Sequence, residues 1–122
     1  MTSFTFIITS EPYKFEAVDS LLNLGEAIIK KGHEIRGIYL FGSGVYNLKK
    51  GAKTGDEVRN LPERITKFCT ENNIEIGGCS TWLSFTGIQP DEIIEGGCTA
   101  GLGELSEWVE DSENVIFFGT GV

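Results

Sequence analysis

The sequence predicts a small α/β domain in which a mostly parallel sheet of four to five strands is doubly wound, with helices on both faces. Short apolar segments rich in β-branched and aromatic residues alternate along the chain with amphipathic segments of helical period. The connections between them are short, as in β-α-β units, whose strands run parallel. At 122 residues the chain has the length of one domain, so a single domain over residues 1–122 is expected.

The first part of the chain predicts one β-α-β unit. The segment FTFII (4–8) is the first predicted strand. Residues 13–31 are predicted to form a helix, because apolar side chains recur every three or four positions, and Gly32 is expected to end it. The segment EIRGIYLF (34–41) follows within three residues as the second strand, which is the tight return of such a unit.

A second helix is predicted after the glycine- and lysine-rich loop at residues 42–55. Either Asp56 caps this helix and Pro62 kinks it, or Pro62 lies in its first turn. One face of the helix is apolar, and the run ends at Asn73. The apolar face consists of Val58, Leu61, Ile65, Phe68 and Cys69.

The last third of the chain predicts two more strands and two short helices. IEIGG (74–78) and NVIFF (114–118) are the strands, and a helix over 80–86 follows the first of them. A glycine-rich loop leads into the second short helix, which is expected to turn its glutamates outward. Its inward residues are expected to be Leu102, Leu105 and Val109.

The composition argues against several classes of protein. A net charge of −8, from 18 acidic and 10 basic residues, repels a phosphate backbone, so direct nucleic-acid binding is not expected. The apolar run near the N-terminus is too short for a signal peptide or a membrane span, which predicts a cytoplasmic protein without membrane attachment. The three cysteines show neither a C-x-x-C pair nor the spacing of zinc ligands, so no metal and no disulfide framework is expected.

The predicted strands all end in small or polar residues. In an open parallel sheet these carboxyl ends lie at one rim, where the loops meet and ligands bind. Cys79 follows the third strand and is therefore expected at this rim. The four strand ends are Thr9–Glu11, Gly42–Gly44, Gly77–Cys79 and Gly119–Gly121.

The stretch IEIGGCSTWLSFTG (74–87) makes Cys79 the first candidate for chemistry. If a helix begins at Ser80, the thiol lies at its N-terminus, where unpaired N–H groups favour the thiolate. A partly buried, inert cysteine is the alternative. Gly77 and Gly78 either allow close approach of a substrate or only form the turn.

Other candidate residues lie near the same rim. Cys98, in the stretch EGGCTAGLGEL, is either a second exchangeable thiol or the filler of a turn. The stretch GSGVYN is only half of a dinucleotide-binding fingerprint. The candidates for the lining of a pocket around Cys79 are Tyr46, Asn47, Gly77, Gly78 and Ser80.

Three stretches, taken in chain order, carry a resemblance to a known family. GVYNLKK…TGDE (44–57) is similar to a G-V-Y-N loop followed by an acidic helix start, and IEIGGCSTWLSFTGI (74–88) to a strand, cysteine and short helix. AGLGELSEW (100–108) is similar to a G-L-G-x-L helix. Together they resemble the DsrE/TusD family of intracellular sulfur carriers, small α/β proteins that relay sulfur as a cysteine persulfide. The resemblance covers nearly the whole chain.

The resemblance implies a DsrE-like fold and a sulfurtransferase in which Cys79 accepts the sulfur, with no metal or organic cofactor. The implied partners are persulfide-donating and sulfur-accepting proteins, and the implied assembly is a homotrimer or homohexamer, or one with related chains. The apolar turn around Trp82 would then lie at an interface. This turn replaces the arginine-rich turn of one branch, which argues against that branch's tRNA-thiolation role. Cys98 departs from the family pattern, and its presence suggests a disulfide or bridging-sulfur pair with Cys79.

Two other functions are compatible with the same residues. The glycine-lined rim would suit a small anion or a nucleotide, in a binding module in which Cys79 has no role. The domain would alternatively be an oligomeric interaction protein without chemistry, which requires Cys79 to be unreactive.

Overall fold

The computed structural model describes residues 1–119 and contains one five-stranded sheet with the strand order β4-β3-β2-β1-β5. Every neighbouring pair of strands is parallel, so the α/β prediction with a parallel sheet is confirmed. The strand expected at 114–118 is one edge of the sheet, and the other edge is a strand that the sequence did not predict. The strands are β1 (Ser3–Ile8), β2 (Glu34–Leu40), β3 (Glu75–Cys79), β4 (Gly97–Ala100) and β5 (Asn114–Phe118).

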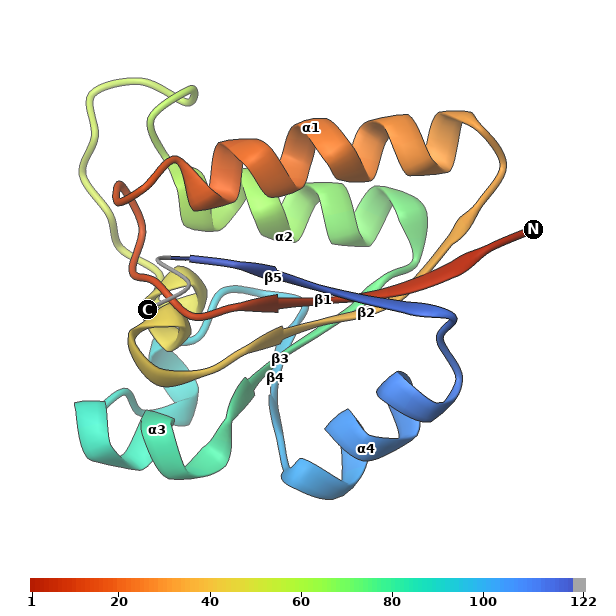
Figure 1. The fold of residues 1–122 in the computed structure, drawn as a ribbon. Helices are drawn as coiled ribbons and strands as arrows, with labels where there is room; N and C mark the ends of the chain where they lie inside the picture. Colours follow the sequence, from red (N-terminus) through yellow and green to blue (C-terminus); the bar gives the residue numbers. More distant parts are fainter. Residues whose placement is uncertain (120–122) are drawn as a thin grey trace.

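Helices cover both faces of this sheet, as Figure 1 shows. The helices α1 (Ala17–Lys30) and α2 (Leu61–Asn72) lie side by side on one face, and α4 (Leu102–Glu110) lies on the other. The short helix α3 (Ser80–Thr86) continues directly from β3 at the carboxyl end of the sheet. Two 3₁₀ segments, η1 (Gly42–Leu48) and η2 (Pro90–Glu92), complete the described elements. No described helix has the length and apolar character to cross a membrane.

Two hydrophobic clusters lie on opposite faces of the sheet because successive strand residues point to opposite sides. The larger cluster fills the space under α1 and α2, and Phe6, Ile38 and Ile65 are among its fully buried members. The smaller cluster lies under α4. It consists of Ile7, Tyr39, Cys79, Ala100 and Trp108, with Trp82, Leu105 and Val115 at its margin.

The helix α1 begins four residues later than the sequence predicts. Tyr13, Phe15 and Glu16 have positive φ angles of 71°, 58° and 52°. This left-handed conformation cannot continue a right-handed helix, so the regular turn starts only at Ala17. The predicted helix therefore included residues 13–16, which form an irregular segment before it.

The helix α2 follows the second of the two interpretations, with Pro62 in its first turn. Asn60 is the N-cap, and its side-chain oxygen accepts the backbone N–H of Glu63 at 3.3 Å. Val58 precedes the helix and is 71% exposed, so its assignment to the apolar face is wrong. Asp56 instead accepts the backbone N–H of Arg59 in the preceding turn.

The predictions for α4 and its approach are wrong in two respects. Trp108, which the predicted inward face left out, is 2% exposed, whereas Leu102 is 67% exposed and Val109 is also exposed. Leu105 alone of the three predicted residues packs against the cluster. Cys98 lies in the edge strand β4 and not in a loop.

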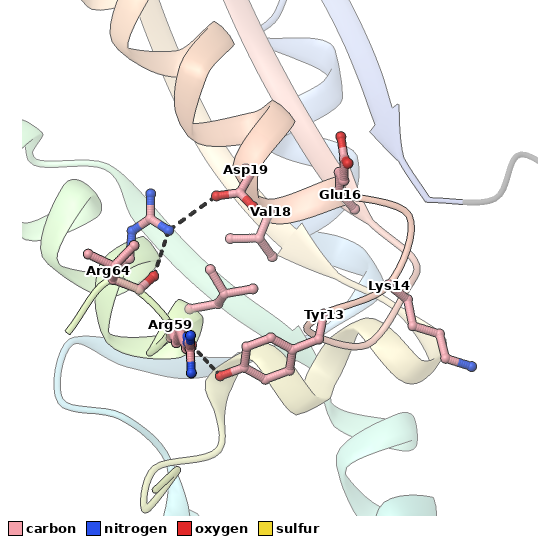
Figure 2. Close-up of a pocket in the computed structure, with 10 residues that line it drawn as sticks. Tyr13, Lys14, Glu16, Val18, Asp19, Arg59 and Arg64 are labelled. Atoms are coloured by element: carbon pink, nitrogen blue, oxygen red, sulfur yellow. Dashed lines mark hydrogen bonds and ion pairs between the residues drawn. The ribbon is translucent and has the colours of Figure 1, made fainter. Parts of the chain in front are cut away.

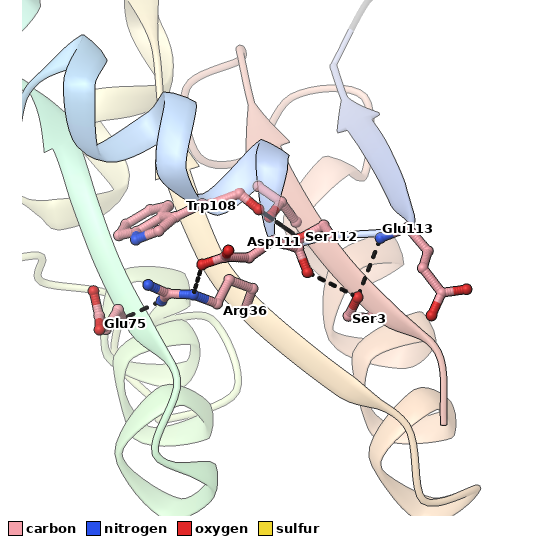
Figure 3. A network of polar contacts seen from close by, with 8 residues as sticks. Ser3, Arg36, Glu75, Trp108, Asp111, Ser112 and Glu113 are labelled. Atoms are coloured by element: carbon pink, nitrogen blue, oxygen red, sulfur yellow. Dashed lines mark hydrogen bonds and ion pairs between the residues drawn. The ribbon is translucent and has the colours of Figure 1, made fainter.

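A polar network fixes the end of α4 to the sheet (Figure 3). The hydroxyl of Thr5, fully buried on β1, donates to the carbonyl oxygen of Trp108 at 3.0 Å. Arg36 on β2 pairs with Asp111 at 3.2 Å and with Glu75 at 3.5 Å. The same guanidinium lies 6.0 Å from the centroid of the Trp108 ring. These contacts hold Trp108 at one position over the sheet.

Candidate functional site

Cys79 is the last residue of β3 and the N-cap residue of α3. The helix spans residues 80–86 as predicted, and Gly87, with a φ of 76°, ends it in the left-handed conformation that glycine favours. The Cys79 side chain makes no capping hydrogen bond to this helix and is directed into the cluster under α4. The residue is 5% exposed in the single chain.

Tyr39 shares this cluster with Cys79 and interacts with its thiol. Its hydroxyl donates to the carbonyl oxygen of Ala100 at 3.3 Å, and Ala100 is the residue opposite Cys79 in the β3–β4 register. Burial, the contact with Cys79 and the charge of Glu104 all raise the pKa of Tyr39. The hydroxyl therefore keeps its proton at neutral pH and remains a hydrogen-bond donor.

The sequence reasoning missed both Tyr39 and Trp108. Their rings meet edge to face, with centroids 6.1 Å apart. The alternation of side chains along EIRGIYL could have indicated Tyr39, because it places this residue on the face of the sheet opposite Ile38 and Leu40. No local pattern shows that β4 and Cys79 share that face, since this depends on the register of β3 with β4.

Gly77 and Gly78 are buried inside β3 and face opposite sides of the sheet. A Cβ at Gly77 would lie 2.7 Å from the Cβ of Ala100, and one at Gly78 would lie 2.9 Å from Cδ1 of Leu48. Neighbouring side chains occupy the space that these glycines leave free. The two glycines therefore allow close packing around the end of β3.

Cys98 lies on β4, on the same face of the sheet as Cys79 but two residues out of register. Gly77 is opposite Cys98, and Cys79 is opposite Ala100. The usual strand spacing and rise then separate the two cysteine Cα atoms by about 8 Å. This exceeds the usual span of a disulfide, so the β3–β4 register disfavours a direct bond between them.

The thiol of Cys98 is exposed and held by the sheet backbone. Its Sγ lies 3.3 Å from the carbonyl oxygen of Ile76. Partial burial and the carboxylates of Glu104 and Glu75 raise its pKa. The fraction of thiolate at neutral pH is therefore below that of an ordinary cysteine.

The structure separates the remaining predicted pocket residues. Asn47 is fully buried, and its amide donates to the carbonyl oxygens of Ser10 and Gly44 at 3.1 and 3.0 Å, which joins η1 to the end of β1. Tyr46 is exposed on η1, and Ser80 is exposed in the first turn of α3. The side-chain oxygens of Asn47 and Ser10 are buried without a partner among the described residues.

An aromatic row runs along the surface beside Cys79 and consists of Phe41, Trp82 and Phe85. The ring centroids of Phe41 and Trp82 are 5.8 Å apart, and those of Trp82 and Phe85 are 5.5 Å apart. Trp82 also packs at the margin of the cluster that holds Cys79. Phe85 is 72% exposed, so this row presents apolar surface next to the thiol.

A cavity of about 320 Å³ lies at the same rim but on the face covered by α1 and α2 (Figure 2). Its lining comes from the starts of these two helices and the segments before them. The Arg64 guanidinium donates hydrogen bonds to the carboxylate of Asp19 at 3.1 Å and to the carbonyl oxygen of Val58 at 2.9 Å. Arg59 pairs with Asp56 at 3.6 Å. Protein carboxylates thus already neutralise the arginines, and the cavity is not a cationic anion site.

The strand end expected at Gly119–Gly121 lies partly outside the described residues, because the structure describes the chain only to Gly119. Within that range no group of three or more histidine, cysteine, aspartate or glutamate side chains is arranged to hold a metal ion.

The model of the DsrE/DsrF-like family matches residues 2–118. An uncharacterized protein of Methanopyrus kandleri is 33% identical over 114 residues, which cover 93% of this chain and 92% of that protein. The "Putative sulfurtransferase DsrE" of Allochromatium vinosum is 24% identical over 127 residues, with 95% of this chain and 98% of that protein covered.

A solved structure shows the same fold. The crystal structure of the ychN protein from E. coli superposes with a TM-score of 0.82 at 22% sequence identity. The match covers 97% of this chain and all of that one, at 100%. The arrangement of five parallel strands and their helices is thus shared over the full length of the match.

Proposed function

Because the chain belongs to the DsrE/DsrF-like family, we propose that it is a sulfur carrier that accepts sulfur as a persulfide on Cys79 and passes it to a second protein. The observation that carries this proposal is the place of Cys79, at the end of β3 where the strand turns into α3. The distant relative from Allochromatium vinosum, named as a sulfurtransferase, supports the class of reaction.

A comparison of the three thiols favours Cys79. Cys69 is buried on α2 in the larger cluster, and burial raises its pKa to about 12, so it is protonated at neutral pH. The pKa of Cys98 is raised by partial burial and by two nearby carboxylates. Cys79 alone lies at the carboxyl end of a central strand, the usual place for chemistry in such sheets.

The reaction is thiol–persulfide exchange. The Cys79 thiolate attacks the outer sulfur of a donor persulfide, a new S–S bond forms, and the donor S–S bond breaks. The donor leaves as a thiolate, which takes up a proton. The thiolate of the acceptor protein then attacks the outer sulfur bound to Cys79 and regenerates the Cys79 thiolate. Each step conserves the number of S–S bonds, so the exchange requires no redox cofactor.

The burial of Cys79 sets a condition on this exchange. At 5% exposure in the single chain, Cys79 is almost covered, and Trp82 and Leu105 pack at the margin of its cluster. The exposed aromatic row Phe41–Trp82–Phe85 beside it would be covered in a homotrimer or homohexamer, or by a related chain. The donor and the acceptor would be cytoplasmic proteins.

The test is the intact mass of the protein after incubation with a persulfide donor under non-reducing conditions. Wild type is expected to gain about 32 Da, the mass of one sulfur, as thiol–persulfide exchange requires. Cys98→Ser is expected to gain the same mass, and Cys79→Ser is expected to gain none. Absence of the adduct from wild type with several donors, or its persistence in Cys79→Ser, would overturn the proposal.

A further inference from the structure

The side chain of Tyr39 crosses β3 and ends beside Cys79. Tyr39 is on β2, opposite Gly77 of β3, and its hydroxyl reaches the carbonyl oxygen of Ala100 on β4 at 3.3 Å. Ala100 is opposite Cys79 in the register of β3 with β4. The hydroxyl therefore lies between two strands at the level of Cys79, and the two side chains share one buried cluster.

The packing around Tyr39 fixes this position. Trp108 holds its ring edge to face at 6.1 Å between centroids. The indole itself lies directly on Gly37, where a Cβ would approach Cε3 of Trp108 to 2.6 Å. The hydrogen bond from Thr5 to the Trp108 carbonyl oxygen anchors the same residue to β1. Tyr39 is thus oriented before any sulfur is bound, which lowers the cost of ordering it.

We propose that Tyr39 is a positioning residue of the sulfur site, whose O–H donates a hydrogen bond to the Cys79 sulfur when that residue is a thiolate or a persulfide anion. The inference rests on the proposed function, because it assigns the group that stabilises the reactive form of Cys79. The proton turns from the Ala100 carbonyl oxygen to the sulfur. At 3.3 Å the bond to Ala100 is longer than the usual O–H···O distance, so little is lost in the exchange.

The charges around the site favour such a donor. Glu104 on α4 acts on both Tyr39 and Cys98, and its negative charge opposes a thiolate nearby. The side chains that share the cluster with Tyr39 and Cys79 carry no charge, since they are Ile7 of β1, Ala100 of β4 and Trp108 of α4. Arg36 lies 6.0 Å from the centroid of the Trp108 ring and is already paired with two carboxylates. A hydrogen bond to a charged sulfur is about twice as strong as a neutral one, which offsets this repulsion.

The test is the rate of alkylation of Cys79 by iodoacetamide as a function of pH, in a Cys98→Ser background. Cys69 does not compete, because burial raises its pKa to about 12 and keeps it protonated, and Cys79→Ser in the same background gives the blank. Tyr39→Phe keeps the ring and removes only the hydroxyl. It is expected to lower the rate about tenfold at neutral pH, the order of effect of losing one hydrogen bond to a charged group.

Two controls separate this effect from a change in the fold. Tyr46→Phe, at an exposed tyrosine on η1, is expected to leave the pH profile unchanged. Replacement of the three tyrosines of the chain by 3-fluorotyrosine keeps the packing and makes the hydroxyl a stronger donor, so the alkylation is expected to be faster than in wild type at the same pH. Superposed profiles for wild type, Tyr39→Phe and the fluorinated protein would overturn the inference.

The alkylation assay contains no transferable sulfur, so its result is independent of the mass measurement for the proposed function. A sulfur adduct on Cys79 with no change of profile in Tyr39→Phe would reject Tyr39 and retain the carrier. A shifted profile without any adduct would retain the Tyr39–Cys79 interaction and reject the carrier.

Discussion

The indole of Trp108 occupies the space that a side chain at Gly37 would fill, since a Cβ there would lie 2.6 Å from Cε3 and 2.7 Å from Cδ2 of the ring. Gly37 belongs to β2 and Trp108 to α4, so this contact sets how closely the helix approaches the sheet. The smaller hydrophobic cluster, with Tyr39 and Cys79, depends on that approach.

Gly37→Ala is expected to destabilise the protein by about 1–3 kcal/mol, because the ring and α4 must move to admit the methyl group. Urea unfolding followed by circular dichroism measures the change. Gly103→Ala on the same helix is the matched control, since no heavy atom lies within 4 Å of the added Cβ. That control is expected to be neutral or stabilising, because alanine has the higher helix propensity. Equal stability of Gly37→Ala and wild type would contradict the packing described.

Asn60→Ala is expected to cost about 1 kcal/mol of unfolding free energy, because it removes the side-chain acceptor of the Glu63 N–H at the start of α2. Asp56→Ala tests the cap that the sequence also allowed and is expected to cost less, since Asp56 lies outside the helix. Thermal unfolding of the two variants ranks them. The reverse order would place the start of α2 at the earlier residue.

Glu92 links η2 to the chain that follows η1. Its carboxylate accepts the backbone N–H of Gln89 at 2.9 Å and pairs with Lys49 at 3.3 Å, and these contacts lower its pKa below the usual 4.5. A lowered pKa in the folded state contributes stability above pH 4.5 that is lost as pH falls through the folded value. Glu92→Gln is therefore expected to lower the Tm at pH 6 and to reduce the further loss of Tm as the pH falls below 4.5. Asp91→Asn serves as the control, and parallel Tm curves for Glu92→Gln and wild type would reject this role.

The reactivity of Cys98 is expected to be suppressed by its carboxylate neighbours. In a Cys79→Ser background, alkylation of Cys98 at pH 8 is expected to be slower than that of free cysteine, because a raised pKa leaves less thiolate. Glu104→Gln keeps a cap for the Gly101 N–H and removes the charge, which is expected to accelerate the reaction by up to about fivefold. Glu110→Gln, at the other end of α4, is the control. A rate for Glu104→Gln no higher than that control would show that the charge is unimportant.

The elements with a strong local signal were predictable from the sequence. The strands at 4–8, 34–41 and 114–118 and the helix at 80–86 agree with the structure to within one residue at each end, because composition and turn residues mark their bounds. The position of Cys79 at the carboxyl rim follows from that order alone. The family resemblance rested on residues 44–57, 74–88 and 100–108 and is confirmed by the family match over residues 2–118.

The features that the sequence did not reveal depend on tertiary packing. Leu105 fits a helix face with Leu102 and Val109 as well as one with Trp108. The structure has the second face inward, because the Trp108 ring fills the space over Gly37, which helical periodicity does not reveal. The left-handed residues before α1 lack the glycine that normally marks such a conformation. The pairing of Tyr39 with Cys79 requires the registers of three strands, which no local pattern contains.

The two faces of the sheet differ in how firmly their helices are attached. The cluster under α1 and α2 is the larger one and ties these helices to the three central strands, whereas α4 is held by the smaller cluster and by the network at its end. We therefore expect α4 to detach at a lower free energy than global unfolding, and its backbone amide hydrogens to exchange earlier than those of α1 and α2. Since Cys79 lies beneath this helix, such partial opening gives reagents and partners transient access to a thiol that the closed chain covers, while the rest of the molecule stays folded.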